Sequence, residues 1–208
     1  MKAFWNERYK SADYVYGEKP NAFFASKITS LSPGKLLLPA EGEGRNAVFA
    51  ASLGWEVWAF DFSEEGKRKA ERLAEKNRVA IHYEVCDTND VRYEADSFDL
   101  MGLFFAHFPE GVRATYHRKL AAFVKPGGKL LIEGFRKEHL ELSRANPQAG
   151  GPKDESMLFS LDILRSDFPD FEWEQLEALT ENLEEGSFHQ GKSALIRALG
   201  TKRKQANH

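Results

Sequence analysis

The stretch PAEGEGRNAV, residues 39–48, lies between an apolar run and a segment with helical spacing. The run is KLLLP, residues 35–39, and the segment is NAVFAASLG, residues 46–54, which stops at a glycine. A glycine-rich turn between a strand and a helix usually binds a phosphate group in open α/β sheets. This turn instead carries Glu41 and Glu43, whose negative charges would repel a phosphate. The residue types in the turn therefore raise the question of which ligand it accepts.

Strand-like and helix-like runs alternate on both sides of the turn. The apolar or β-rich runs cover residues 35–39, 55–61, 81–87, 98–105 and 129–135. The runs with helical spacing cover residues 46–54, 63–77 and 112–124. Such alternation predicts an α/β fold, with a mostly parallel sheet, right-handed crossovers and helices on both faces.

The C-terminal third is less regular. Residues 136–157 contain Asn-Pro and Gly-Gly-Pro and read as a long loop, whereas 159–168 read as a helix. The segments 171–183 and 193–202 are ambiguous, but the turn-rich EEGSFHQGK between them indicates a hairpin. We divide the single expected domain, 1–208, into an N-terminal aromatic lid (1–30), a cofactor-binding core (31–135) and a substrate-side loop with a C-terminal hairpin (136–202).

The composition is that of an ordinary globular domain, with 208 residues, of which 42% are hydrophobic and 29% charged. The net charge of −3 gives no electrostatic case for binding nucleic acid. With Cys86 as the one cysteine, no internal disulfide is possible. The first residues, MKAFWNERYKSADY, lack the apolar region of a signal peptide, and no apolar stretch approaches the ~20 residues of a membrane span. We expect a cytoplasmic monomer or homodimer with no nucleic-acid or membrane partner, and we find no spacing typical of a metal site.

The glycine spacing by itself allows a nicotinamide cofactor. Gly42, Gly44 and Ala47 match the dinucleotide-binding pattern, and Asp61 follows at about the expected ~20-residue offset. A carboxylate in that position binds the ribose hydroxyls. A match of this kind is weakly specific, so a nicotinamide-dependent oxidoreductase is one alternative.

The two glutamates argue against that alternative. A carboxylate about 5 Å from one phosphate charge costs on the order of 3 kcal/mol at an effective dielectric constant near 20. Glu41 and Glu43 suit a nucleoside whose other end is cationic, such as S-adenosylmethionine, which carries a sulfonium and an ammonium against one carboxylate. The competing interpretation is that both glutamates point to solvent.

Asp87 and Thr88 follow the third strand-like run, where a carboxylate can accept a hydrogen bond from the adenine amino group. Phe62, next to Asp61, is placed to cover the adenine face. Asp87 could equally serve as a turn residue, and Phe62 could pack in the core.

These features together give a family resemblance. The order of the glycine turn, Asp61, Asp87, FDLMGLFFAHFP and KPGGKLLIEGF resembles the class I S-adenosylmethionine-dependent methyltransferases. The chain is most similar to the small bacterial methyltransferases grouped with the tellurite-resistance and thiopurine methyltransferases. The similarity extends almost from end to end, through FWNERY, YVYGEKPNAFF, AEGEGRNAVFAASLG, GGPKDESML and EEGSFHQGKSALIRALG.

The resemblance implies a Rossmann-like, seven-stranded sheet with an antiparallel last strand, S-adenosyl-L-methionine as cofactor and a small-molecule acceptor. The cofactor contacts that we expect are Glu41, Gly42, Gly44, Asn46, Asp61, Phe62, Asp87, Thr88, Phe104 and Phe105. The chain departs from the superfamily at Leu38 and Ala40, where an acid and a further glycine are frequent. We therefore choose Glu41 as the residue that binds the ammonium.

Two histidines are candidate general bases. His107 follows the fourth strand-like run, and His189 lies in the expected hairpin between the last two strands. If the sixth strand is parallel, the hairpin opens on the ligand side, where a histidine can remove a proton near neutral pH. For each histidine the alternative is a hydrogen-bonded loop position.

The N-terminal segment is unusually aromatic. Trp5, Tyr9, Tyr14 and Tyr16 precede Gly17, and aromatic faces stabilise cations such as a sulfonium. We expect this segment to be a lid over cofactor and acceptor, with a helix packed on the sheet edge as the alternative. A cofactor-binding protein without turnover also stays open, as do sulfur, metalloid oxyanion and nitrogen acceptors.

Overall fold

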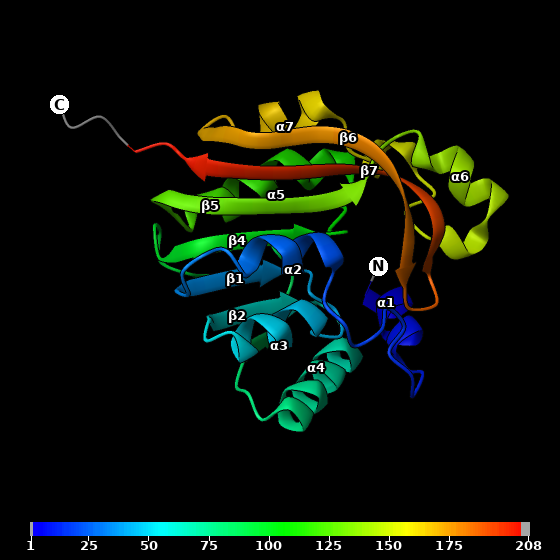
Figure 1. The fold of residues 1–208 in the computed structure, drawn as a ribbon, viewed down its shortest axis with the longest axis horizontal. Coiled ribbons are helices and arrows are strands. Elements are labelled where there is room, and N and C mark those ends of the chain that lie inside the picture. Colours follow the sequence, from blue (N-terminus) through cyan, green and yellow to red (C-terminus); the bar gives the residue numbers. More distant parts are fainter. Residues whose placement is uncertain (1, 205–208) are drawn as a thin grey trace.

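Seven strands form one sheet in the order β3-β2-β1-β4-β5-β7-β6 in the computed structural model, which describes residues 2–204 (Figure 1). The strands are β1 (Lys35–Pro39), β2 (Glu56–Asp61), β3 (His82–Val85), β4 (Phe98–Phe104), β5 (Val124–Phe135), β6 (Phe171–Glu185) and β7 (His189–Lys202). β1 to β5 are mutually parallel, and β7 runs antiparallel to both β5 and β6. The predicted fold class is confirmed, including the antiparallel last strand.

Helices cover both faces of the sheet. They are α1 (Lys2–Tyr9), α2 (Ala22–Ile28), α3 (Arg45–Ser52), α4 (Glu64–Asn77), α5 (Glu110–Ala122), α6 (His139–Ala145) and α7 (Leu161–Asp167). α2 and α3 lie in front of the sheet in Figure 1, and α5 and α7 lie behind it. No helix among residues 2–204 is both long and apolar enough to cross a bilayer.

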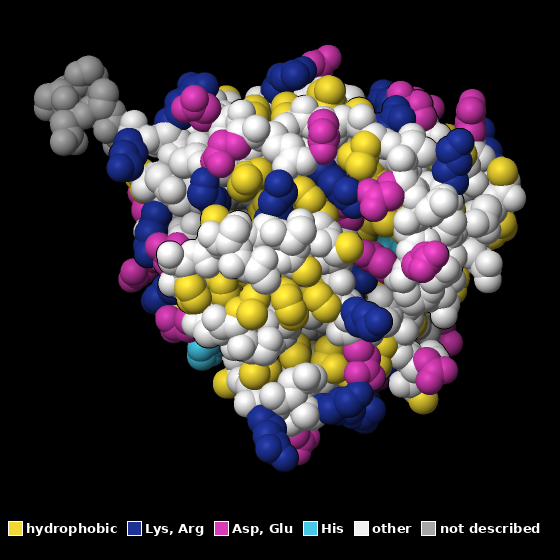
Figure 2. Space-filling view, viewed as in Figure 1, with side chains coloured by type: hydrophobic (Ala, Val, Ile, Leu, Met, Phe, Trp, Pro, Cys, Tyr) yellow, Lys and Arg dark blue, Asp and Glu magenta, His cyan; other side chains and the backbone are white. Residues whose placement is uncertain are grey.

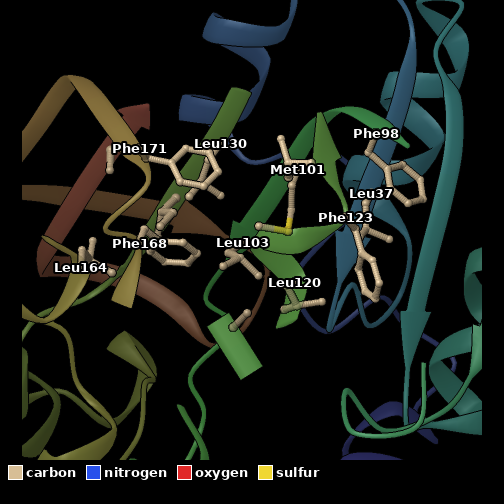
Figure 3. Packing of buried hydrophobic residues seen from close by; sticks show 14 of the residues in the cluster. Leu37, Phe98, Met101, Leu103, Leu120, Phe123, Leu130, Leu164, Phe168 and Phe171 are labelled. Carbon is tan, nitrogen blue, oxygen red and sulfur yellow. The ribbon is translucent and has the colours of Figure 1, made fainter. Parts of the chain in front are cut away.

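The alternation of side chains along each strand supplies a core on each face. Leu37, Met101 and Leu103 belong to the cluster packed against α5 and α7, which Figure 3 shows from close by. Leu36 and Leu100, one position away, belong to the cluster packed against α2 and α3. Because both faces are covered, the central strands read as continuous apolar runs.

Capping residues set the limits of α4. Ser63 precedes the helix, and its hydroxyl accepts a hydrogen bond from the backbone N–H of Gly66 at 3.1 Å. Glu64 and Glu65 occupy the first turn, where the helix dipole favours negative charge. The run 63–77, predicted as a helix, begins at the same serine.

The C-terminal third departs from the prediction in one segment and confirms the predicted hairpin in another. The segment 136–157, predicted as a loop, contains α6 and two single 3-10 turns at Pro147–Ala149 and Glu155–Met157. The ambiguous segments form the long strands β6 and β7, whose hairpin bends toward α1 (Figure 1). The reason is pairing, because β7 forms ladders with both β5 and β6, which the local sequence pattern does not show.

The surface of the face in Figure 2 carries Lys and Arg side chains interspersed with Asp and Glu. Hydrophobic side chains lie between these charges on the same face. The mixture of signs agrees with the small net charge of −3.

Candidate active site

A cavity of about 570 Å³ lies beyond the carboxyl ends of β1, β2 and β4, where ligands bind in open α/β sheets. Its walls come from the N-terminal segment, the β1–α3 turn, the ends of β2, β4 and β5, the loop after α6, and the tip of the β6–β7 hairpin. Segments far apart in sequence therefore meet at one site.

Glu41 occupies the N-terminus of α3. Its Oε1 accepts hydrogen bonds from the backbone N–H groups of Asn46 and Ala47, both at 2.8 Å. This is the position in which a helix N-terminus holds a phosphate in dinucleotide-binding folds. Burial raises the pKa of Glu41 to about 7, against the effect of these hydrogen bonds and of Arg45. The carboxylate of the chain itself therefore fills the phosphate position.

Glu43 is engaged differently. Its Oε1 lies 2.7 Å from Nζ of Lys69, and its two oxygens accept hydrogen bonds from the backbone N–H groups of Val15 and Tyr16 at 3.1 and 3.2 Å. The charge of Glu43 is thus balanced by α4, and its hydrogen bonds fix the end of the N-terminal segment. The two glutamates of the turn consequently have separate structural roles.

Asp61 ends β2 and borders the cavity beside the turn. Its Oδ2 accepts from the backbone N–H of Gly42 at 3.2 Å, and its Oδ1 accepts from that of Ser63 at 2.8 Å. Burial raises the pKa of Asp61 to about 6, although these hydrogen bonds act in the opposite direction. Asp61 is thereby held at a fixed distance from the glycine turn.

The glycines permit close packing around the turn. Gly44 has φ of 83°, and a Cβ added there would lie 2.5 Å from Cβ of Ala70 on α4. Gly42 has φ of 60°, and a Cβ there would lie 2.6 Å from Oη of Tyr9. Neither distance is compatible with a larger residue, so both positions favour glycine.

A second cavity of about 460 Å³ adjoins the first through Phe62 and includes Asp87. Oδ1 of Asp87 accepts a hydrogen bond from Oη of Tyr116 at 2.8 Å and one from the backbone N–H of Asn89 at 2.8 Å. Thr88 is buried and lines neither of these two cavities. Phe62 and Asp87 thus line one cavity together, and Thr88 does not.

Three of the four lid aromatics line the main cavity. Trp5 stacks on Tyr9 with ring centroids 5.5 Å apart, and Tyr16 lies 6.5 Å from both rings. Tyr14 does not line the cavity; its hydroxyl donates to the carbonyl of Lys69 at 3.0 Å. Tyr14 therefore anchors the segment to α4 and does not contribute to the wall of this cavity.

His107 borders the cavity but has both ring nitrogens occupied. Nδ1 donates to the carbonyl of Met157 at 2.9 Å, and Nε2 accepts from the backbone N–H of Phe135 at 3.0 Å. Burial lowers the pKa of His107 to about 3. No lone pair on the ring remains to take a proton from a methyl acceptor. This geometry corresponds to the alternative for His107, a hydrogen-bonded loop position rather than a general base.

His189, at the start of β7, also lines the cavity. Its ring lies 4.1 Å from that of Phe105 and 4.6 Å from that of Tyr16, measured between centroids. Burial lowers the pKa of His189 to about 4, opposed by Glu185. A neutral imidazole at neutral pH is therefore placed between the lid and the end of β4.

The remaining expected cofactor residues also reach the cavity. Phe104 and Phe105 line it from the end of β4, and Phe105 has a positive φ of 55°. Asn46 lines it from α3, and its Oδ1 accepts from the backbone N–H of Asn21 at 2.8 Å. The described residues contain no group of three or more His, Cys, Asp or Glu side chains that could hold a metal ion.

The cavity also contains residues that the sequence did not single out, namely Arg8, Arg45, Lys153, Phe108 and Phe135. Arg8 donates to Oη of Tyr16 at 3.2 Å and lies over the ring of Phe188 at 4.2 Å. FWNERY, which contains Arg8, did mark this segment, but nothing local indicated that the arginine faces the site. Contacts between the segment and the hairpin tip decide that.

Comparisons with known proteins agree with this architecture. Residues 39–128 match the family model of a methyltransferase domain. A probable thiol methyltransferase 2 of Arabidopsis thaliana is 28% identical over 122 residues, which is 56% of this chain and 54% of that protein. The match thus spans about half of the curated relative.

Solved structures show the same fold over nearly all of the chain. One, from work on the conversion of a disulfide bond into a thioacetal group during echinomycin biosynthesis, has a TM-score of 0.79 at 17% identity, covering 100% of this chain and 94% of that one. TehB from Haemophilus influenzae has a TM-score of 0.70 at 16% identity, covering 97% of this chain and 67% of that one.

The family match covers the glycine turn, the acids that follow it and the KPGG segment, which are the features that carried the resemblance. The resemblance predicted from the sequence is therefore confirmed. Residues 39–128 are similar to a methyltransferase domain, and the chain has the Rossmann-like fold of these solved structures.

Proposed function

We propose that the protein is an S-adenosylmethionine-dependent methyltransferase acting on a small-molecule acceptor. The observation that carries this proposal is the carboxylate of Glu41 at the N-terminus of α3. A pyrophosphate would compete with that carboxylate for the same N–H groups and would be repelled by it. S-adenosylmethionine has no phosphate, so the turn suits it better than a dinucleotide.

The cofactor fits the acidic side of the cavity. Oε2 of Glu41 has only a long contact, 3.4 Å to Nδ2 of Asn46, and we assign it the ammonium. Asp61 would accept from the ribose hydroxyls, and Phe62 and Asp87 would contact the adenine. Among residues 2–204, Arg8 forms no ion pair with a carboxylate, which leaves it available for the carboxylate of the cofactor. The methyl group then faces the aromatic rings and His189.

Methyl transfer is an in-line displacement, for which the protein mainly aligns the acceptor with the sulfonium. In our proposal the aromatic walls position the acceptor and exclude water, and His189 receives the proton that the acceptor loses. Because the curated relative is described as a thiol methyltransferase, we propose a thiol as the first acceptor class and a metalloid oxyanion as the second.

Calorimetry followed by an acceptor screen tests the proposal. We expect S-adenosylmethionine and S-adenosylhomocysteine to bind and the nicotinamide dinucleotides not to bind. Release of S-adenosylhomocysteine is then measured with alkyl and aryl thiols, selenite and tellurite. Binding of a nicotinamide without S-adenosylmethionine would indicate an oxidoreductase, and binding without turnover on any acceptor would indicate a non-catalytic binding protein.

A further inference from the structure

Glu185 and His189 face each other at the tip of the β6–β7 hairpin. They are the last residue of β6 and the first of β7, and they form the final pair of the ladder. Directly opposed residues of an antiparallel pair project from the same face of the sheet. The hairpin register therefore places a carboxylate beside the imidazole that lines the cavity.

The carboxylate of Glu185 is held by donors from two other segments. Oε2 accepts from a guanidinium N–H of Arg45 at 2.7 Å. Oε1 accepts from Nδ2 of Asn21 at 3.1 Å and from the backbone N–H of Ala22 at 3.3 Å. Burial alone would raise the pKa of Glu185, but His189 and Arg45 lower it to about 2. Glu185 is therefore an oriented anion at neutral pH.

The environment of Nδ1 of His189 determines which ring nitrogen carries the proton. Nδ1 is buried and makes no hydrogen bond within residues 2–204, and Oε2 of Glu185 lies 3.6 Å away. An ionised carboxylate only accepts hydrogen bonds, so a lone pair on Nδ1 would be repelled by it. The favourable state has the proton on Nδ1 and the lone pair on Nε2. A small side-chain movement would bring the pair within hydrogen-bonding distance.

Burial keeps the ring of His189 neutral until the reaction. Burial, Arg45 and His139 lower the pKa of His189, and Glu185 raises it. Tyr16 and Phe105 pack against the ring and restrict its orientation. The lone pair on Nε2 is therefore available near neutral pH, and Glu185 stabilises the imidazolium that forms when a proton arrives.

We propose that Glu185 is a positioning residue that fixes His189 in the Nδ1–H tautomer. Nε2 of His189 then takes the proton from the molecule that receives the methyl group. This inference rests on the proposed function. In the step, the lone pair of acceptor X–H forms the bond to the methyl carbon, and the electrons of the carbon–sulfur bond return to sulfur. The proton of X moves to Nε2 of His189 and then to solvent.

Long-range ¹H–¹⁵N NMR spectra of the imidazoles of the full chain at pH 7 test this directly. His189 is assigned by the signal lost in His189→Gln. We expect Nδ1–H in the wild type, a shift toward Nε2–H in Glu185→Ala, and partial recovery in Glu185→Asp. The matched control is Glu181→Ala on the same strand, whose carboxylate pairs with Arg197 at 2.6 Å, and it should leave the tautomer unchanged.

The inference would be overturned if the proton of His189 were on Nε2 in the wild type. It would also be overturned if the proton stayed on Nδ1 in a folded Glu185→Ala variant. If Glu185→Ala does not fold, the wild-type tautomer and the spectrum of Glu185→Gln still decide it.

A kinetic measurement uses 2-mercaptoethanol, a thiol that is protonated at pH 7. Glu185→Ala should slow release of S-adenosylhomocysteine at least ~10-fold and leave the cofactor dissociation constant within about twofold. Failure of the wild type to methylate any acceptor would contradict the proposed function. The NMR spectra test the effect of Glu185 on the tautomer of His189 whether or not the protein methylates an acceptor.

Discussion

Oε1 of Glu43 lies 2.7 Å from Nζ of Lys69, and both side chains are almost completely buried. The same carboxylate holds the backbone N–H groups of Val15 and Tyr16. The glycine turn, α4 and the lid segment thus converge on one ion pair. This arrangement links the stability of the domain to the position of the N-terminal segment.

Removing one member of that pair should be strongly destabilising. Lys69→Met leaves the charge of Glu43 buried and unpaired, which typically costs about 3–5 kcal/mol. Urea denaturation gives the free energy of unfolding. The double variant Glu43→Gln with Lys69→Met should recover part of the loss, because the uncompensated charge is gone. A loss below about 1 kcal/mol in Lys69→Met would contradict this account.

Asp61 is expected to contribute to nucleoside binding. Asp61→Ala should weaken S-adenosylmethionine and adenosine alike by about 1–3 kcal/mol, because the ribose hydroxyls lose a charged acceptor. Calorimetry measures both dissociation constants, and circular dichroism checks the fold. Because Asp61 also accepts from Gly42 and Ser63 on its two oxygens, the free energy of unfolding of Asp61→Ala is measured beside the affinities, to separate loss of the turn from loss of the ribose contact. Unchanged affinities in folded Asp61→Ala would exclude the ribose role.

Glu41 should discriminate between ligands with and without an ammonium group. Glu41→Gln keeps an oxygen for capping α3 but removes the charge. We expect weaker binding of S-adenosylmethionine and S-adenosylhomocysteine and little change for adenosine, as measured by calorimetry. An equal loss for adenosine would indicate that the residue only shapes the turn.

The pKa values of Glu41 and Asp61 predict how cofactor affinity depends on pH. Burial raises them to about 7 and about 6 in the free protein, above their ordinary values. Folding of the free protein therefore favours their protonated forms, and their contribution to stability falls as pH rises through about 4 to 7. A cationic ligand favours the ionised forms instead.

Binding of S-adenosylhomocysteine should thus strengthen at least ~10-fold between pH 5.5 and 7.5, with release of protons. Calorimetry in buffers of different ionisation enthalpy measures both effects. Glu41→Gln should flatten most of the dependence. An affinity independent of pH in the wild type would show that Glu41 does not face the positive end of the ligand.

The two histidines should give opposite results when replaced. His189→Ala should leave the dissociation constant of S-adenosylmethionine within about twofold and slow turnover at least ~10-fold. His107→Ala should instead destabilise the fold by about 1–3 kcal/mol, because a buried backbone N–H and a carbonyl lose their partner. Rates per folded protein and chemical denaturation separate the two effects. Undiminished turnover in His189→Ala would remove its role as base.

Much of the cofactor side follows from the sequence. The alternation of apolar strands and amphipathic helices specifies a parallel sheet, and parallel strands bring their carboxyl ends to one edge. The places of Glu41, Asp61 and Asp87 in the chain were therefore sufficient to predict that they gather there. Local capping signals, such as Ser63 before α4, were equally readable because they act within one turn of helix.

The acceptor side was decided by tertiary structure. Whether His107 or His189 keeps a free nitrogen depends on Met157 and Phe135, which are distant in sequence from His107. Likewise, Glu43 serves α4 and the lid, and Arg8 faces the cavity, because separate segments meet there. Periodicity records which face of an element is apolar, whereas hydrogen-bond partners across long sequence separations depend on packing. The sequence by itself thus determined the sheet and the edge at which the carboxyl ends of its strands meet, and only the packing of the N-terminal segment and the hairpin tip against that edge determined the geometry around His189.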